Sequence, residues 1–211
     1  MKKDEKLEEG PIFIEAINIG TINVNLEALP GSTYIQHRFS MQTIEDIVER
    51  ELAGAVTKKP KRKYRSLDEE YESCFWYTDD GKNAIPTAAF IGAIMFAVTD
   101  LTISKALVKR TVRILGEVVP IRFKKINRRI DRAVRGTFKV PDIRHRPEFV
   151  DWSCTVPVTY NADTITADQV VNLFNIAGFS SGIGDWRPSS PKSSGQHGMF
   201  KVVPTGRAYV K

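Results

Sequence analysis

The sequence has few residues that could form a disulfide framework or a metal centre. It contains only two cysteines in 211 residues, Cys74 and Cys154, and no CxxC motif, so neither disulfides nor a zinc site is indicated. The three histidines, His37, His145 and His197, are scattered along the chain and form neither a metal-ligand set nor a catalytic triad. We therefore expect no metal, no cofactor and no enzymatic activity.

Long hydrophobic runs are also missing. The longest apolar stretch, Ala84–Val98, contains Pro86 and Thr87 and is too short to span a bilayer. The charged segment Met1–Lys6 has no apolar region of the kind that a signal peptide requires. These absences predict a cytoplasmic protein that does not contact a membrane.

The charge of the chain is unevenly distributed. Hydrophobic residues make up 42% and charged residues 27% of the sequence, which is compatible with a packed core. The net charge is +6, but Ser104–Glu148 alone has 14 Lys/Arg against 4 Asp/Glu, a net +10, so the remainder sums to −4. A concentration of positive charge in one segment favours a polyanionic partner.

Periodicity and turn residues predict a mixed α and β fold. The expected order is a strand, an insertion, a helix, a strand pair, a basic segment, a strand, a helix, a glycine-rich loop and a last strand. The predicted elements are the strand region Ile12–Leu29, the helix Ile85–Ala97, the strand pair Val108–Phe123 bent at Gly116, the strand Phe149–Tyr160, the helix Ala167–Ala177 and the strand Met199–Val203. Without the insertion, this order is the β-α-β-β-α-β pattern of a ferredoxin-like or RRM-like α+β fold, here as one domain over residues 1–211.

The insertion between the first strand and the first helix covers residues 40–83. Met41–Ala55 has helical spacing, and the basic run Lys58–Arg65 that follows is broken by Pro60. The position of this run favours a basic finger that contacts nucleic acid, while a nuclear-localisation-like patch is the alternative. Its candidate contacts are Lys58, Lys59, Lys61, Arg62 and Lys63.

The densest basic segment is Lys124–Arg135. If it is a helix, most of its arginines share one side and form a cationic stripe that would bind a phosphate backbone in a salt-dependent way. A solvated surface is the alternative. Two more guanidiniums are expected in a loop at Ile143–Pro147. The candidate contacts of both segments are Lys124, Lys125, Arg128, Arg129, Arg132, Arg135, Arg144 and Arg146.

The glycine-rich loop, residues 178–198, is expected to present backbone N–H groups to phosphate. It has no Walker lysine pattern and follows a helix instead of opening one, which excludes a P-loop and a Rossmann turn. Trp186 would stack on a base or anchor the loop to the core. The candidate contacts are Gly182, Gly184, Trp186, Arg187, Lys192, His197 and Gly198.

His37 and Arg38 follow the first strand region. A histidine beside an arginine can act as a general base in RNA cleavage, but it can equally contact phosphate or pack in the structure. Because no second catalytic partner is visible in the sequence, we expect a binding or structural role.

These features carry a resemblance to a known superfamily. Glu148–Val203, with its glycine clusters Gly182–Gly184 and Gly195–Phe200, resembles the C-terminal half of the RAMP superfamily of CRISPR-associated RNA-binding proteins. Ile85–Ile94 is similar to the first helix of those proteins, and the insertion falls where their backbone subunits carry extra elements. The resemblance implies an RRM-like fold, binding of single-stranded RNA and assembly into a filament along it. The spacer between the glycine clusters is longer than in that superfamily, and no catalytic residue is carried over.

A second likeness covers most of the chain. His37–Ser40, Asp142–Phe149 and Gly182–Pro188 are similar to segments of a group of phage proteins without an assigned activity. This likeness implies a location in the host cytoplasm.

The sequence therefore predicts a non-enzymatic protein that binds single-stranded nucleic acid, RNA before DNA, as a homo-oligomer or filament. Three alternatives stay open. They are a phage single-stranded-DNA or recombination accessory protein, a mimic of a CRISPR subunit, and a metal-independent ribonuclease that uses His37.

Overall fold

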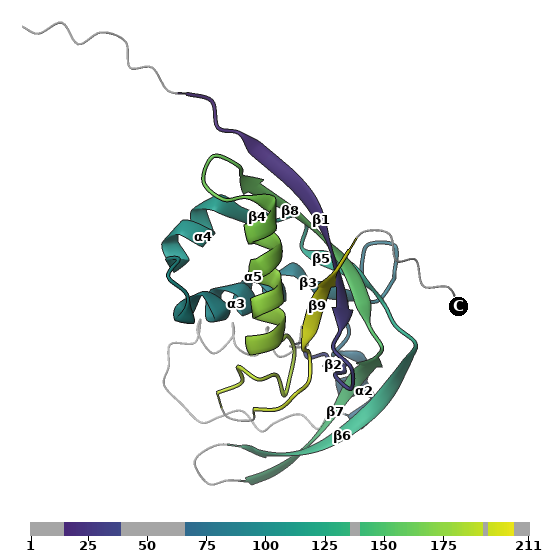
Figure 1. Cartoon of the computed structure of the whole chain (residues 1–211). Helices are drawn as coiled ribbons and strands as arrows, with labels where there is room; N and C mark the ends of the chain where they lie inside the picture. Colours follow the sequence, from purple (N-terminus) through teal and green to yellow (C-terminus); the bar gives the residue numbers. More distant parts are fainter. Residues whose placement is uncertain (1–14, 39–65, 136–139, 192–193, 205–211) are drawn as a thin grey trace, which may run out of the picture.

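The computed structural model describes residues 15–38, 66–135, 140–191 and 194–204. These residues form a main antiparallel sheet with helices on one face, and a second, smaller sheet that extends from its lower end (Figure 1). The strands are β1 (Ile19–Ala28), β2 (Tyr34–Ile35), β3 (Ala84–Pro86), β4 (Val112–Ile114), β5 (Val118–Arg122), β6 (Lys125–Arg135), β7 (Val140–Val150), β8 (Ser153–Asn161) and β9 (Phe200–Val203). The helices are α2 (Leu67–Glu72), α3 (Thr87–Ala97), the short 3-10 helix η1 (Val98–Asp100), α4 (Lys105–Thr111) and α5 (Ala167–Ser180).

The main sheet has the strand order β3-β5-β8-β1-β9, and β4 also pairs with β8. All its pairings are antiparallel, and β1 and β8 form its centre with Val24 opposite Val156. Since β4 and β5 pair with different lengths of β8, the bend at Gly116 divides one strand position between two short strands. Gly116 has φ +78°, a conformation that glycine adopts without strain.

The core lies between this sheet and the helices α3 and α5. Alternate residues of the central strands, including Val24, Leu26 and Val156, are buried, as expected when one face of a sheet is covered. Phe90 of α3 and Phe174 of α5 meet across the helix pair, with ring centroids 6.5 Å apart. The helix α5 begins with a capping box, in which Thr166 accepts from the N–H of Gln169 and the Gln169 side chain accepts from the N–H of Thr166.

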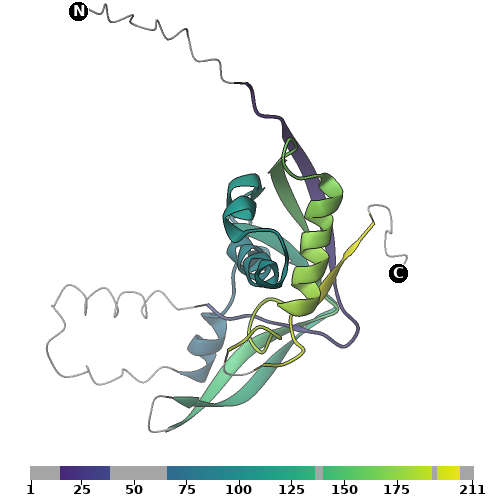
Figure 2. The same ribbon diagram turned by 60° about the vertical axis from the view of Figure 1, so that its left-hand side comes forward.

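The second sheet has the order β2-β7-β6, and its strands β6 and β7 form a long hairpin (the arm) that projects from the body (Figure 2). The chain passes from the arm into β8 at Asp151, which has φ +50°.

The helix α3 begins after Pro86, which is its N-cap, and the missing N–H of this proline costs no helical hydrogen bond.

The α+β class with antiparallel sheets is confirmed, while several element boundaries are wrong. The predicted helix starts at Thr87, because Ala84–Pro86 pairs with β5. The predicted strand pair loses its residues Val108–Thr111 to the helix α4. Phe149–Tyr160 is two strands separated at Asp151. Residues 40–65, most of the expected insertion, lie outside the described residues, and the rest of it contains α2. In the part of the chain that the structure describes, no helix is long and apolar enough to cross a membrane.

Candidate nucleic-acid interface

The basic segment Lys124–Arg135 is mostly a β-strand, so the cationic stripe that a helix would have formed on one side is not present in it. β6 pairs with β7 over eleven residue pairs, from Lys125 opposite Val150 to Arg135 opposite Val140. The exposed hairpin ladder stabilises the extended conformation, which helical spacing of arginines alone cannot reveal. Ile143–Pro147 also belongs to this ladder and is not a loop. Because side chains alternate across a strand, the arginines divide between the two faces of the arm.

One face of the arm carries Arg128 and Arg132. Arg128 donates from Nε to His145 Nδ1 at 2.9 Å, pairs with Asp68 and lies over the ring of Tyr71 at 4.9 Å. The helix α2 therefore packs against the base of this face. Farther along, Arg132 is exposed, directly opposite Ile143 in the ladder.

Two large apolar side chains lie on the same face. Ile130 is 61% and Ile143 48% exposed. Because every second residue of β6 points to the same face, Ile130 lies between Arg128 and Arg132 on that face. An exposed pair of this kind on a projecting hairpin is unusual unless it contacts a partner.

The opposite face holds a network that joins the arm to the glycine-rich loop. Arg129 binds Asp131 at 2.9 Å and Glu148 at 3.1 Å, and its Nη1 lies 3.5 Å from Nε2 of His197. Thr33 donates to Glu148 at 2.9 Å and shares a hydrogen bond of 2.9 Å with Nδ1 of His197. Two carboxylates thus neutralise the charge of Arg129, and His197 holds the loop in place.

The pKa values in this network follow from burial and charge. Burial raises the pKa of Glu148, but hydrogen bonds from Asn127, Thr33 and Arg129 outweigh it, and the net pKa is lowered. Burial and the nearby Arg129 lower the pKa of His197. His197 is therefore disfavoured as a cation that would contact phosphate.

Arg146 was predicted to contact nucleic acid, and its burial contradicts this. It is 5% exposed, and its Nη1 donates to Glu70 at 3.2 Å and to the carbonyl of His145 at 3.0 Å. Its Nε lies 3.5 Å from Asp185 of the glycine-rich loop. The guanidinium is accommodated inside because two carboxylates face it, and it joins α2, β7 and the loop.

His37 lies beside this cluster. Its Nδ1 is 4.0 Å from Asp185, and burial followed by the charge of Arg146 lowers its pKa. The buried Cys74 has its thiol beside the backbone of Arg38, and burial raises the pKa of this thiol. Arg38 stacks over the ring of Trp76 at 4.4 Å. The structure thus supplies His37 with a carboxylate neighbour that the sequence did not reveal.

The glycines of the loop serve its packing. Gly182, Gly184 and Gly198 have positive φ, and a Cβ on Gly198 would lie 1.7 Å from the carbonyl oxygen of Ile183. The N–H of Gly182 donates to Ala177 and that of Gly198 to Thr33. These two N–H groups are therefore not available to a phosphate, and the predicted cradle is wrong for them.

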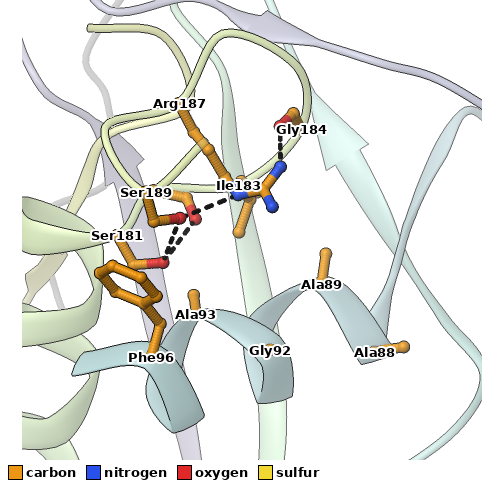
Figure 3. Close-up of a pocket in the computed structure, with 11 residues that line it drawn as sticks. Ala88, Ala89, Gly92, Ala93, Phe96, Ser181, Ile183, Gly184, Arg187 and Ser189 are labelled. Carbon is orange, nitrogen blue, oxygen red and sulfur yellow. Dashed lines mark hydrogen bonds between the residues drawn. The ribbon is translucent and has the colours of Figure 1, made fainter. Parts of the chain in front are cut away.

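Trp186 and Arg187 are both partly buried in the loop. The carbonyl of Trp186, a residue with φ +57°, accepts from the N–H of His197 at 3.3 Å. Arg187 donates to Gly184 O at 2.7 Å and to Ser189 Oγ at 2.9 Å, and stands at the wall of a cleft of about 300 Å³ (Figure 3). The opposite wall of this cleft is the helix α3, through Ala88, Ala89, Gly92, Ala93 and Phe96.

The accessible cations form a different set from the predicted one. Arg122 was not predicted as a contact. It is exposed at the end of β5, opposite Ser153 of β8 in the sheet, and the alternation of apolar residues in Val118–Arg122 could have placed its side chain away from the core. Lys124 lies 3.8 Å from Asp151, and Lys125 is exposed at the start of the arm. We call the exposed cations from the end of β5 to the middle of β6 the basic ridge: Arg122, Lys124, Lys125, Arg128 and Arg132. Strand alternation places Lys125 on the opposite face of the arm from Arg128 and Arg132.

The remaining predicted contacts are not tested. Arg144 is half-buried on the arm. Only the backbone of Arg135 is described. Lys58, Lys59, Lys61, Arg62, Lys63 and Lys192 lie outside the described residues.

Comparisons with known proteins give a likeness in fold. No family model matches the chain, and no curated protein is similar enough in sequence to be a relative. A chain of the cryo-EM structure of the Type III-B Cmr-beta bound to cognate target RNA is similar, with a TM-score of 0.52 and 10% sequence identity. The match covers 88% of this chain and 59% of that chain, so this chain spans less than two thirds of the protein it resembles. The expected likeness to phage proteins gains no support from these comparisons.

Proposed function

We propose that the chain binds single-stranded nucleic acid, RNA in preference to DNA, along the basic ridge and without cleaving it. The observation that carries this proposal is the run of five exposed cations on consecutive strands, from Arg122 to Arg132. The part of the ridge that lies on β6, from Lys125 to Arg132, spans about 23 Å, at about 3.3 Å per residue. The ridge is therefore long enough to follow several phosphates of one strand.

Electrostatics give the proposal a magnitude. Lys124 and Arg128 are partly offset by Asp151 and Asp68, so we expect about three to five phosphate contacts. For a single strand the logarithm of affinity then falls with the logarithm of salt concentration with a slope of about −2 to −3.5. A fourfold rise in salt would weaken binding roughly 20- to 100-fold.

The apolar side chains of the arm favour a single strand over a duplex. Ile130 lies between Arg128 and Arg132 on β6, and Ile143 lies opposite Arg132 on β7. Covering unstacked base faces with such apolar side chains is favourable, because it removes apolar surface from water. In a duplex these base faces are stacked and inaccessible. The arm would thus hold bases with little readout of their sequence.

Two further observations support RNA as the ligand and other subunits as partners. The similar Cmr-beta chain comes from a structure bound to target RNA, although 10% identity speaks for fold alone. The strand order, with β1 and β8 central and β9 and the β4/β5 position outside, supports a ferredoxin-like, RRM-like assignment of the core. Filament formation is part of the same proposal.

Fluorescence anisotropy tests the proposal with labelled RNA, DNA of the same sequence, and a duplex. We expect the tightest binding to single-stranded RNA, since 2′-hydroxyl contacts distinguish RNA from DNA. Arg132→Glu should weaken binding strongly. Lys105→Glu is the matched control, because it makes the same charge change at an exposed site on α4, away from the arm (Figure 1). Equal effects of the two variants would reduce the ridge to a nonspecific surface, and clearly tighter binding to DNA would favour the accessory-protein alternative.

A metal-independent ribonuclease is the second candidate, because His37 has Asp185 at 4.0 Å and a lowered pKa. A neutral imidazole oriented by a carboxylate can act as a general base. RNA incubated with the wild type and with His37→Ala separates the two functions. Intact RNA in both reactions supports pure binding, whereas cleavage that His37→Ala abolishes would make this chain an enzyme. Copurification with host proteins but no nucleic acid would point to a CRISPR-subunit mimic.

A further inference from the structure

Within the described part of the chain, the central strand β1 is paired along one edge and along only part of the other. Its β8 edge is paired from Ile19 to Glu27. On its other edge β9 covers Asn25–Ala28, and no strand in the described part of the chain pairs with the stretch from Ile19 to Val24. Among the described residues, the first half of this central strand is therefore an edge of the sheet.

Hydrogen-bond alternation identifies the groups that this free edge presents. Ala28 donates to Trp152 on the β8 side, and Leu29 donates to Met199 on the β9 side. Since successive residues of a strand point their N–H and C=O groups to opposite edges, odd-numbered residues of β1 face the β9 side. The N–H and C=O groups of Ile19, Thr21 and Asn23 therefore lie on the free edge, and all three residues are exposed.

The free stretch has defined ends. β9 ends at Val203, opposite Asn25, and Pro204 is no longer in the strand. At the other end β1 begins at Ile19, and residues 15–18 are not in a strand. Among the described residues, no strand pairs beside Ile19–Asn23, and this stretch is as long as one extended segment of about five residues.

This edge lacks the features that normally prevent strand addition. Folded proteins protect edge strands with lysines, prolines or bulges, because an open edge is a template for another chain. From Ile17 to Leu26 the sequence has no charged residue and no proline. Ile17 and Ile19, which are 58% and 63% exposed, add apolar surface beside the unpaired groups.

We propose that the free edge of β1 pairs with the same edge of a second copy of this chain, antiparallel about a two-fold axis through Thr21. In this register Thr21 faces Thr21 of the second copy and Ile19 faces its Asn23, so each edge residue bonds to its opposite. Each copy presents the same stretch, Ile19–Asn23, so the two unpaired stretches have equal length. Because neither stretch carries a charge, identical strands can lie side by side without repulsion. Threonine pairs are favourable cross-strand neighbours.

Such a contact closes on itself. An isologous interface uses the same patch on both copies and gives a dimer, whereas a filament requires two different patches. The dimer would join two main sheets into one continuous sheet and set two arms in a fixed relation. This inference is independent of nucleic-acid binding.

Sedimentation equilibrium of the full chain over a wide concentration range tests the proposal. The expected species has twice the 23.8 kDa mass of the chain. Thr21→Pro removes one N–H that points away from β8, so the β1–β8 ladder stays intact while the dimer is lost. Thr21→Val keeps the N–H and should remain dimeric, and Thr159→Lys, on the strand position opposite Thr21 in β8, should also remain dimeric. Thermal unfolding checks that each variant is folded.

Hydrogen exchange of the amides of Ile19, Thr21 and Asn23 gives a second readout. Their protection should rise with protein concentration and disappear in Thr21→Lys. A monomer at every concentration, or a dimer that Thr21→Pro leaves unchanged, would overturn the proposal. Protection that is independent of concentration but lost when the chain ends at Pro204 would also overturn it, because the chain's own C-terminal residues would then cover the edge.

Discussion

Arg146 and Arg132 both belong to the basic segment of the sequence, but replacement by alanine should have different effects at the two positions. Arg146→Ala should lower the stability of the protein, and Arg132→Ala should lower its affinity for RNA. Arg146 is 5% exposed and faces Glu70 and Asp185 at 3.2 and 3.5 Å. Removing one partner of a buried ion pair costs about 3 to 5 kcal/mol, because the remaining charge is left unpaired. The side chains of Glu70 and Asp185 are 25% and 31% exposed, so water recovers part of this loss. We therefore expect Arg146→Ala to lower the free energy of unfolding by about 3 kcal/mol.

For a chain of this length, a loss of this size lowers the melting temperature by about 6 to 12 °C. Arg132 is exposed, and surface substitutions of this kind change stability by less than about 0.5 kcal/mol. Arg132→Ala should instead weaken binding to single-stranded RNA. Urea unfolding and fluorescence anisotropy of both variants measure the two effects. The account of Arg146 is refuted if Arg146→Ala is as stable as the wild type and loses RNA affinity to the same extent as Arg132→Ala.

Three further changes have defined outcomes. The pKa values of His37 and His197 are lowered in the folded chain, so below a pH of about 6.5 these side chains bind protons more readily in the unfolded chain. The free energy of unfolding should therefore fall towards pH 5. In urea unfolding across this pH range, the double variant with glutamine at both positions should show a weaker dependence of stability on pH. Gly198→Ala should cost at least about 2 kcal/mol, because the new Cβ meets the carbonyl oxygen of Ile183 and φ is positive, and a melting temperature equal to the wild type would contradict this packing. Ile130→Ala should leave the melting temperature unchanged and weaken RNA binding by about 1 kcal/mol, roughly fivefold in anisotropy, whereas unchanged affinity would remove the isoleucine from the interface.

The fold class was predictable because its signals are local. The alternation in β1 and β8 and the capping box at Thr166 depend on residues close in sequence. The arm was not predictable in the same way. Its strand conformation is stabilised by the ladder between Lys125–Arg135 and Val140–Val150, while the spacing of its arginines is equally typical of a helix.

The candidate site was predictable in charge but not in accessibility. The net +10 segment does contain the basic ridge, yet the sequence could not distinguish exposed Arg132 from buried Arg146. That difference depends on Glu70 and Asp185, which are 76 and 39 residues away from Arg146 in the chain. Burial of an ionisable group is set by partners that only the tertiary structure brings together.

The salt dependence of RNA binding tests the central claim most directly. The wild type should show a linear decrease of log affinity against log salt concentration with a slope of about −2 to −3.5. A double variant of two exposed ridge residues, Arg122→Ala with Arg132→Ala, should reduce the magnitude of this slope by about 1.4, since each lost phosphate contact contributes about 0.7. No measurable binding by the wild type, or the same slope in the double variant, would contradict the account.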